Sequence, residues 1–219
     1  MAICEVKNLT RDYGNGRGVF DLSFSINRGE VFGFLGPNGA GKTTTIRHLM
    51  GFLKPQKGYC TIGGMDCWKD RADIQKTLGY IPGEMVFFED MTGTEFLNYM
   101  MKYRKVKTNK RIKELMDRFE LDTRSKIKKM SKGMKQKIGI VAAFMHDPEV
   151  LILDEPTSGL DPLMQNRFIE LVMEERSRGK TILMSSHIFE EVERTCSRVA
   201  IIKNGRLVAM DEVEKLKAA

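Results

Sequence analysis

Residues Gly36 to Thr44 combine glycines, a lysine and two threonines at a spacing that suits phosphate binding. The glycines can take backbone angles closed to other residues, so consecutive N–H groups can converge on one anion. A helix predicted from Lys42 would point its positive dipole end at this anion, Lys42 adds a full charge, and the Thr43 hydroxyl can ligate Mg²⁺. The spacing matches the Walker A motif and predicts a polyphosphate site. Its residues are Gly36, Pro37, Asn38, Gly39, Ala40, Gly41, Lys42, Thr43 and Thr44.

Two carboxylates follow the apolar run Val150–Leu153. A buried strand that ends in two acids has the form of a Walker B motif. Asp154 is placed to hold Mg²⁺, usually through water, and completes the ligand set that Thr43 begins. Glu155 is the candidate base that orients an attacking water. An Asp and a Glu can also merely cap a strand end, but the Walker A segment in the same chain favours the catalytic interpretation.

Strands and helices alternate around these motifs. Because such alternation implies a parallel sheet, we expect an α/β fold of the P-loop type, with a mainly parallel core sheet flanked by helices and an antiparallel N-terminal side sheet. Predicted strands are Cys4–Leu9, Val19–Ile26, Val31–Leu35, Tyr59–Ile62, Leu78–Ile81, Val150–Leu153, Thr181–Ser185, Arg198–Ile202 and Arg206–Met210, with a loop over residues 14–18. Predicted helices start at Lys42 or cover Thr94–Tyr103, Asn109–Phe119, Lys132–Phe144, Pro162–Arg178, Ile188–Cys196 and Val213–Lys217.

Residues 83–149 differ in character from the rest of the chain. They hold three of the predicted helices, and Thr92-x-x-Glu95 predicts a capping box. The stretch Lys102–Lys137 has 15 lysines and arginines against 4 acids, a net charge of +11 in a chain of +7. These cations are either a solvated helical face or a footprint for nucleic acid or an acidic membrane leaflet. We expect one domain over residues 1–219, with a nucleotide-binding core (1–82 and 150–219) and an inserted helical lobe (83–149).

Length and composition narrow the class of protein. A chain of 219 residues is large enough for a real core without disulfide bonds. Its four cysteines form no CxxC pair, so we expect reduced thiols. No signal sequence is visible, and the apolar runs fall far below the roughly 18 residues that a membrane span needs. Any role at a membrane would therefore need a partner protein.

Five further segments resemble, in order, those of the nucleotide-binding subunit of ABC transporters. Tyr13 matches the aromatic residue that stacks on adenine, and Gly79–Glu84 match the loop that normally carries a glutamine. Met130–Met134 match the signature motif, Ser158–Asp161 match the loop after Walker B, and His187 matches the switch histidine. The resemblance covers nearly all of the chain.

The resemblance implies an ATPase that uses ATP and Mg²⁺. Two subunits of this family pack head to tail, so Ser131, Gly133 and Asp161 of one subunit would complete the nucleotide site of the other. His187 would contact the γ-phosphate and Glu155. Without the family, Ser131 would be only a helix cap, and His187 would be an ordinary residue after a strand.

The resemblance also implies partners and a location. It implies a separate transmembrane permease and a homodimer or heterodimer of nucleotide-binding subunits. The chain would then be cytoplasmic and peripheral on the cytoplasmic face of the cell membrane, with indirect membrane contact, and no nucleic acid is expected. The signature and loop segments are similar to those of exporters, which favours export.

Two departures from the family pattern keep alternatives open. Gly83 stands where the loop glutamine is expected, followed by Glu84, and a glycine side chain cannot ligate a metal. In the signature, Lys132 replaces a glycine and Met134 replaces a glutamine. One alternative is therefore a nucleotide-gated module that hydrolyses ATP slowly. The other is an ABC ATPase outside transport, in DNA repair or translation, which the basic stretch keeps open.

Overall fold

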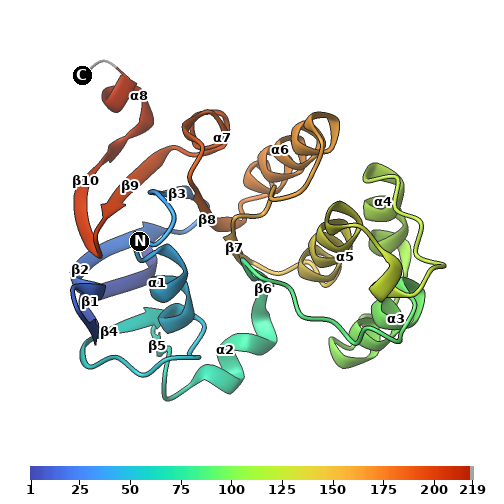
Figure 1. The fold of residues 1–219 in the computed structure, drawn as a ribbon, viewed down its shortest axis with the longest axis horizontal. Coiled ribbons are helices and arrows are strands. Elements are labelled where there is room, and N and C mark those ends of the chain that lie inside the picture. The colour runs from blue at the N-terminus through green and yellow to red at the C-terminus, as the bar shows by residue number, and fades with distance from the viewer. Residues whose placement is uncertain (218–219) are drawn as a thin grey trace.

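The computed structural model describes residues 1–217, and its two β-sheets lie on the side of the molecule away from helices α3 and α4 (Figure 1). The larger sheet has six strands in the order β10-β9-β3-β8-β7-β6, and every neighbouring pair is parallel except β9 and β10. This confirms the predicted α/β fold with a mainly parallel core sheet. The strands are β3 (Val31–Leu35), β6 (Leu78–Ile81), β7 (Val150–Asp154), β8 (Thr181–Ser186), β9 (Arg198–Lys203) and β10 (Arg206–Glu212).

The smaller sheet is antiparallel throughout and has the order β2-β1-β4-β5. It confirms the predicted N-terminal side sheet. Its fourth strand was not predicted, because two residues are too short to show an alternating pattern. The strands are β1 (Ala2–Gly14), β2 (Arg17–Asn27), β4 (Lys57–Ile62) and β5 (Met65–Asp66).

The first hairpin is tighter than the loop predicted over residues 14–18. Strand β1 runs to Gly14 and β2 starts at Arg17, so Asn15 and Gly16 alone form the turn. Their φ angles of 54° and 73° suit the primed turns that match the twist of paired strands. The strands are longer because this turn lets pairing continue to its edge, and Tyr13 therefore lies in a strand.

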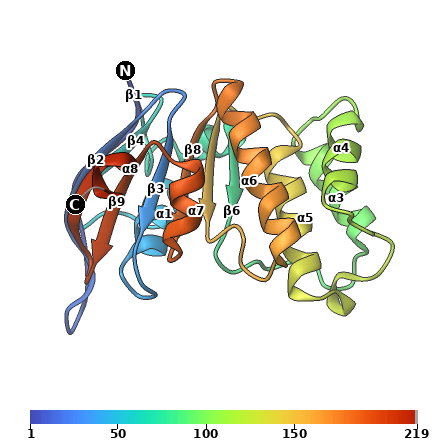
Figure 2. The same ribbon diagram turned by 90° about the horizontal axis from the view of Figure 1, so that it is seen from above.

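The helices lie on both faces of the larger sheet and at one end of the molecule (Figure 2). Thr92 and Glu95 form the predicted capping box at the start of α3. Helix α2 and the short 3-10 helix η1 were not predicted. The helices are α1 (Lys42–Leu49), α2 (Arg71–Thr77), α3 (Gly93–Tyr103), α4 (Lys110–Arg118), η1 (Ile127–Lys129), α5 (Lys132–Phe144), α6 (Pro162–Ser177), α7 (Phe189–Thr195) and α8 (Val213–Lys217).

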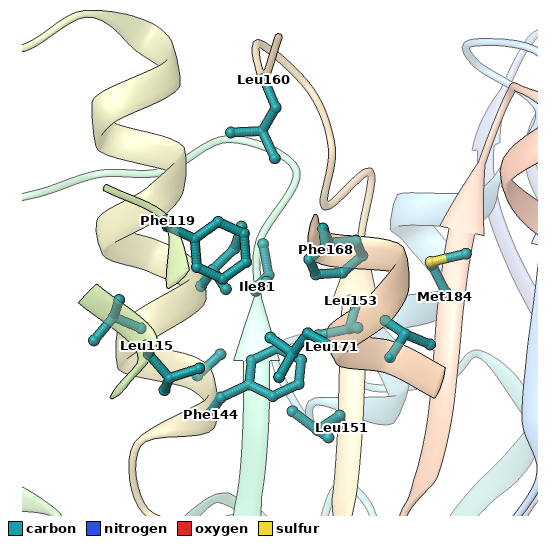
Figure 3. Packing of buried hydrophobic residues seen from close by; sticks show 14 of the residues in the cluster. Ile81, Leu115, Phe119, Phe144, Leu151, Leu153, Leu160, Phe168, Leu171 and Met184 are labelled. Atoms are coloured by element: carbon teal, nitrogen blue, oxygen red, sulfur yellow. The ribbon is translucent and has the colours of Figure 1, made fainter. Parts of the chain in front are cut away.

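The two faces of the larger sheet bury two separate hydrophobic cores. Side chains alternate along a strand, so Phe32 and Phe34 of β3 pack toward the side sheet and α1, while Val31 packs toward the opposite face. The second core holds Phe144 of α5 against Phe168 of α6, with ring centroids 6.4 Å apart (Figure 3). Both cores fix the carboxyl ends of the parallel strands, where the polar motifs lie.

Helices α3, α4 and α5 bury their apolar sides in the same core as β7 and α6. Leu115 and Phe119, at the end of α4, lie in one cluster with Leu151 and Leu153 of β7 (Figure 3). Arg111 of α4 also pairs with Glu175 of α6. The division at residues 83 and 149 stays a prediction. Within residues 1–217, no helix is both long and apolar enough to cross a lipid bilayer.

Candidate functional site

The Walker A loop connects the buried strand β3 to helix α1. Gly41 precedes the helix with φ of 111°, and no side chain caps the N-terminus of α1. The N–H groups of the first helical turn have no carbonyl partners within the helix, so they are suited to bind an anion. Position 36 has room only for a glycine, because a Cβ there would lie 2.4 Å from the backbone oxygen of Ile202. The loop therefore has the shape and polarity of a phosphate site.

Lys42 is held inside this loop. Its side chain is only 5% exposed, and its ammonium donates hydrogen bonds to the carbonyl oxygens of Gly36 at 2.5 Å and Pro37 at 3.2 Å. The same nitrogen lies 3.2 Å from Glu155 Oε1. That carboxylate oxygen makes no hydrogen bond of suitable geometry and is buried. A buried cation and a carboxylate oxygen without a hydrogen bond thus face each other beside the loop.

Asp154 is fully buried and both of its carboxylate oxygens are bound by hydroxyl groups. Thr43 Oγ1 donates to Oδ2 at 2.7 Å, and Ser185 Oγ donates to Oδ1 at 2.5 Å. Ser185 also accepts a hydrogen bond from the backbone N–H of Glu155 at 3.0 Å. The structure thus brings together Thr43 and Asp154 from 111 positions apart. It adds Ser185, which was not predicted.

Glu155 contacts His187 as well as Lys42. His187 Nδ1 lies 2.8 Å from Glu155 Oε2, and the histidine side chain is about half exposed. Glu155 has φ of 49°, a left-handed angle that is rare outside glycine. The turn after β7 therefore points this carboxylate toward the Walker A loop and the end of β8.

A cavity of about 460 Å³ opens in front of these groups. Tyr13 lies at its rim with its side chain 51% exposed, and the Arg11 guanidinium is 5.2 Å from the centre of the ring. An exposed ring beside a phosphate loop is suited to stack on a base. The residues that line the cavity are Tyr13, Gly16, Arg17, Gly18, Asn38, Gly39, Gly41, Lys42, Thr43, Thr44, Glu155, Asn204 and Gly205.

Gly83 lies directly beside the carboxylate of Asp154. A Cβ at this position would be 3.0 Å from Asp154 Oδ2 and 3.8 Å from Thr43 Oγ1. The loop that carries Gly83 therefore contacts the predicted metal site through its backbone. Glu84 is exposed and has no hydrogen bond to the site within the described residues.

The signature segment and the loop after Walker B contact each other outside this cavity. Ser131 caps α5 by accepting a hydrogen bond from Met134 N at 3.2 Å, and Asp161 caps α6 in the same way. A Cβ on Gly133 would lie 2.7 Å from the backbone oxygen of Gly159, so the two segments touch. Ser131, Gly133 and Asp161 do not line the cavity that holds Lys42.

The chemistry of the donor set fits Mg²⁺. Thr43 and Asp154 offer hard oxygen ligands, which Mg²⁺ prefers, and Glu155 Oε1 is a buried oxygen without a hydrogen bond. Among residues 1–217 no group of three or more His, Cys, Asp or Glu side chains could hold a metal ion. A phosphate chain and water would therefore have to supply the remaining ligands.

The comparisons with known proteins agree with this geometry. The ABC transporter family profile matches residues 19–158. The chain belongs to the ABC transporter family. Its relatives in this family include the bacitracin transport ATP-binding protein BcrA of Bacillus licheniformis, which is 38% identical over 218 residues, covering 98% of this chain and 71% of that protein. The linearmycin resistance ATP-binding protein LnrL of Bacillus subtilis is 38% identical over 211 residues, covering 94% of this chain and 68% of that protein.

A solved ATP-binding subunit of an ABC transporter has the same fold. It superimposes with a TM-score of 0.90 at 34% identity, covering 99% of this chain and 92% of that chain. This ABC ATPase subunit therefore binds and hydrolyses ATP, and the predicted family and enzyme class are confirmed. The roles given to individual residues stay predictions.

Proposed function

We propose that this chain is the ATP-hydrolysing subunit of an exporter and drives a separate transmembrane permease. The observation that carries the proposal is the constellation of Lys42, Glu155 and His187 in front of the Asp154–Thr43 pair. Relatives 38% identical are named for bacitracin transport and linearmycin resistance, which supports export of a drug-like or peptide-like compound.

In the proposed mechanism the Walker A loop binds the phosphates of ATP. Lys42 exchanges its carbonyl contacts for phosphate oxygens, and the N-terminus of α1 stabilises the same charge. Tyr13 stacks on the base at the rim of the cavity. Thr43 and Asp154 would hold Mg²⁺, which supplies charge to the β- and γ-phosphates when bound.

Glu155 is the proposed general base. Its Oε2 is fixed by His187 at 2.8 Å, which leaves Oε1, the oxygen nearest Lys42, to accept a proton from a water. His187 holds the carboxylate in this orientation and reaches the γ-phosphate. Both side chains come from the carboxyl ends of neighbouring strands, β7 and β8, so the sheet fixes their separation.

The site is proposed to be completed by a second copy of this chain or a similar subunit. Ser131, Gly133 and Asp161 lie outside the cavity, at two capped helix starts that contact each other through Gly159. A helix N-terminus favours an anion, so this end of one subunit suits the γ-phosphate bound by another. We further propose residues 83–149 as the helical lobe and a place on the cytoplasmic face of the membrane, bound to the permease.

The experiment is steady-state ATP hydrolysis by the wild type and by Glu155→Gln. Removal of a general base should lower kcat by about 10² to 10⁴. Glu84→Gln is the matched control, because Glu84 is an exposed carboxylate near the site without a contact to it. Equal rates for Glu155→Gln and the wild type would contradict the base assignment and favour the slowly hydrolysing module.

A further inference from the structure

Two consecutive serines end strand β8 and face opposite sides of the sheet. Ser185 binds Asp154, as described above, whereas Ser186 Oγ donates a hydrogen bond to Glu191 Oε2 at 2.8 Å. Both serines are fully buried. Alternation along the strand explains why neighbouring hydroxyls serve two different carboxylates.

Glu191 is a buried carboxylate held between two segments. Its side chain is 7% exposed, and Oε1 accepts a hydrogen bond from Thr157 Oγ1 at 2.5 Å. Within residues 1–217, no cation lies in ion-pair distance of this carboxylate. A buried charge is costly unless hydrogen bonds compensate it, and both oxygens of Glu191 are bound by hydroxyls. The carboxylate therefore bridges the loop after β7 and the end of β8.

Each hydroxyl belongs to a segment that carries functional groups. Thr157 lies in the turn after Glu155, where Ser158 N donates to Glu155 O at 3.1 Å and Leu160 N donates to Thr157 O at 3.0 Å. Gly159, two residues after Thr157 in the same turn, touches the signature segment. Ser186 directly precedes His187, which binds Glu155.

We propose that Glu191 is a positioning residue for hydrolysis. It holds His187 and residues 157–161 at a fixed separation, and so couples the Glu155–His187 pair to the signature end of the same subunit. Glu191 itself touches neither ATP nor the reacting water. The inference rests on the proposed roles of Glu155 and His187. It adds a residue that links them to the signature segment, which is proposed to contact the nucleotide bound by the other subunit.

The test compares three substitutions in the full chain. Glu191→Gln keeps the size of the side chain but removes its second strong acceptor, and Thr157→Val removes only the hydroxyl that binds Oε1. Ser186→Ala removes the other donor. A small displacement of reacting groups can cost about 10² in rate. We expect kcat to fall about 10-fold to 100-fold, with KM for ATP within about twofold of the wild type, because the Walker A loop is untouched.

A matched control separates positioning from stability. Glu175 is a similarly buried carboxylate, 3% exposed, that pairs with Arg111 and Arg178 away from the site. Glu175→Gln should lower the melting temperature and leave kcat of the folded protein unchanged. The loss of kcat in the double variant Glu191→Gln, Thr157→Val should be smaller than the two single losses combined, because both substitutions weaken the same group of hydrogen bonds around residue 191.

The outcomes distinguish this inference from the proposed function. Wild-type kcat in folded Glu191→Gln and Thr157→Val, beside a large loss in Glu155→Gln, would overturn the positioning role alone. Wild-type kcat in Glu155→Gln would instead overturn the proposed mechanism. If Glu191→Gln does not fold, Thr157→Val decides: a loss of kcat with unchanged KM supports the inference, and wild-type kinetics overturns it.

Discussion

Gly83→Ala tests the predicted metal site with a single methyl group. The new Cβ would lie 3.0 Å from Asp154 Oδ2, whereas ordinary contacts begin at 3.4 Å. The two atoms must therefore move apart by about 0.4 Å. Asp154 cannot yield freely, because Thr43 and Ser185 hold its two oxygens at 2.7 and 2.5 Å. We expect kcat to fall about tenfold and the Mg²⁺ concentration for half-maximal rate to rise, since misplaced groups lose rate steeply.

The assay is steady-state ATP hydrolysis across a Mg²⁺ titration, with thermal unfolding measured in parallel. Gly83 lies in an exposed loop, so the free energy of unfolding should change by less than about 1 kcal/mol. Glu84→Ala is the control, because it changes the neighbouring side chain without pressing on Asp154. An unchanged rate and Mg²⁺ dependence in Gly83→Ala would refute the placement of the metal at Asp154. If the rate of hydrolysis fell only in Glu84→Ala, the effect of this loop on hydrolysis would be assigned to the Glu84 side chain.

Three further predictions concern stability and surface charge. Thr92→Ala removes the cap of α3 and should cost about 1 kcal/mol, a fall of about 2 to 4 °C in melting temperature by calorimetry; no change would contradict the cap. Burial, with a smaller contribution from Arg104, lowers the pKa of His146 from 6.5 to about 4, so the unfolded chain binds more protons in this window. The free energy of unfolding should therefore fall from pH 6.5 to 4, by up to about 1.4 kcal/mol per pH unit. Denaturant unfolding at a series of pH values measures this slope, and His146→Phe should reduce it; an equal slope in the variant and the wild type would contradict the assignment. Lys126→Glu with Lys129→Glu should weaken sedimentation with acidic vesicles and leave ATP affinity unchanged, whereas unchanged sedimentation would mark these lysines as a solvated face.

The sequence predicted the elements whose patterns are long and regular. Strand β3 and helix α5 have the predicted bounds, because a continuous apolar run and a Ser131 cap mark them. Helix α2 was missed because only Ile74 is buried in it, which leaves no apolar periodicity to recognise. The first hairpin turn was missed although Asn15-Gly16 is a dipeptide typical of two-residue hairpin turns.

The candidate site was predictable only where one short segment carries the pattern. The Walker residues lie in such segments, whereas Ser185 and Glu191 acquire their contacts from partners 31 and 34 residues away. Those contacts depend on β7 and β8 being neighbours in the sheet, which local sequence does not encode. A serine in a buried strand was the available signal, because a buried hydroxyl requires a hydrogen-bond partner.

The most direct test of the account is the association state of Glu155→Gln with ATP and Mg²⁺. If the capped helix starts at Ser131 and Asp161 bind nucleotide held by another subunit, blocked hydrolysis should trap a dimer on size exclusion with light scattering. The wild type should return to monomer as ATP is consumed, and Lys42→Ala combined with Glu155→Gln should not dimerise. A Glu155→Gln protein that binds ATP and stays monomeric at high protein concentration would contradict the account.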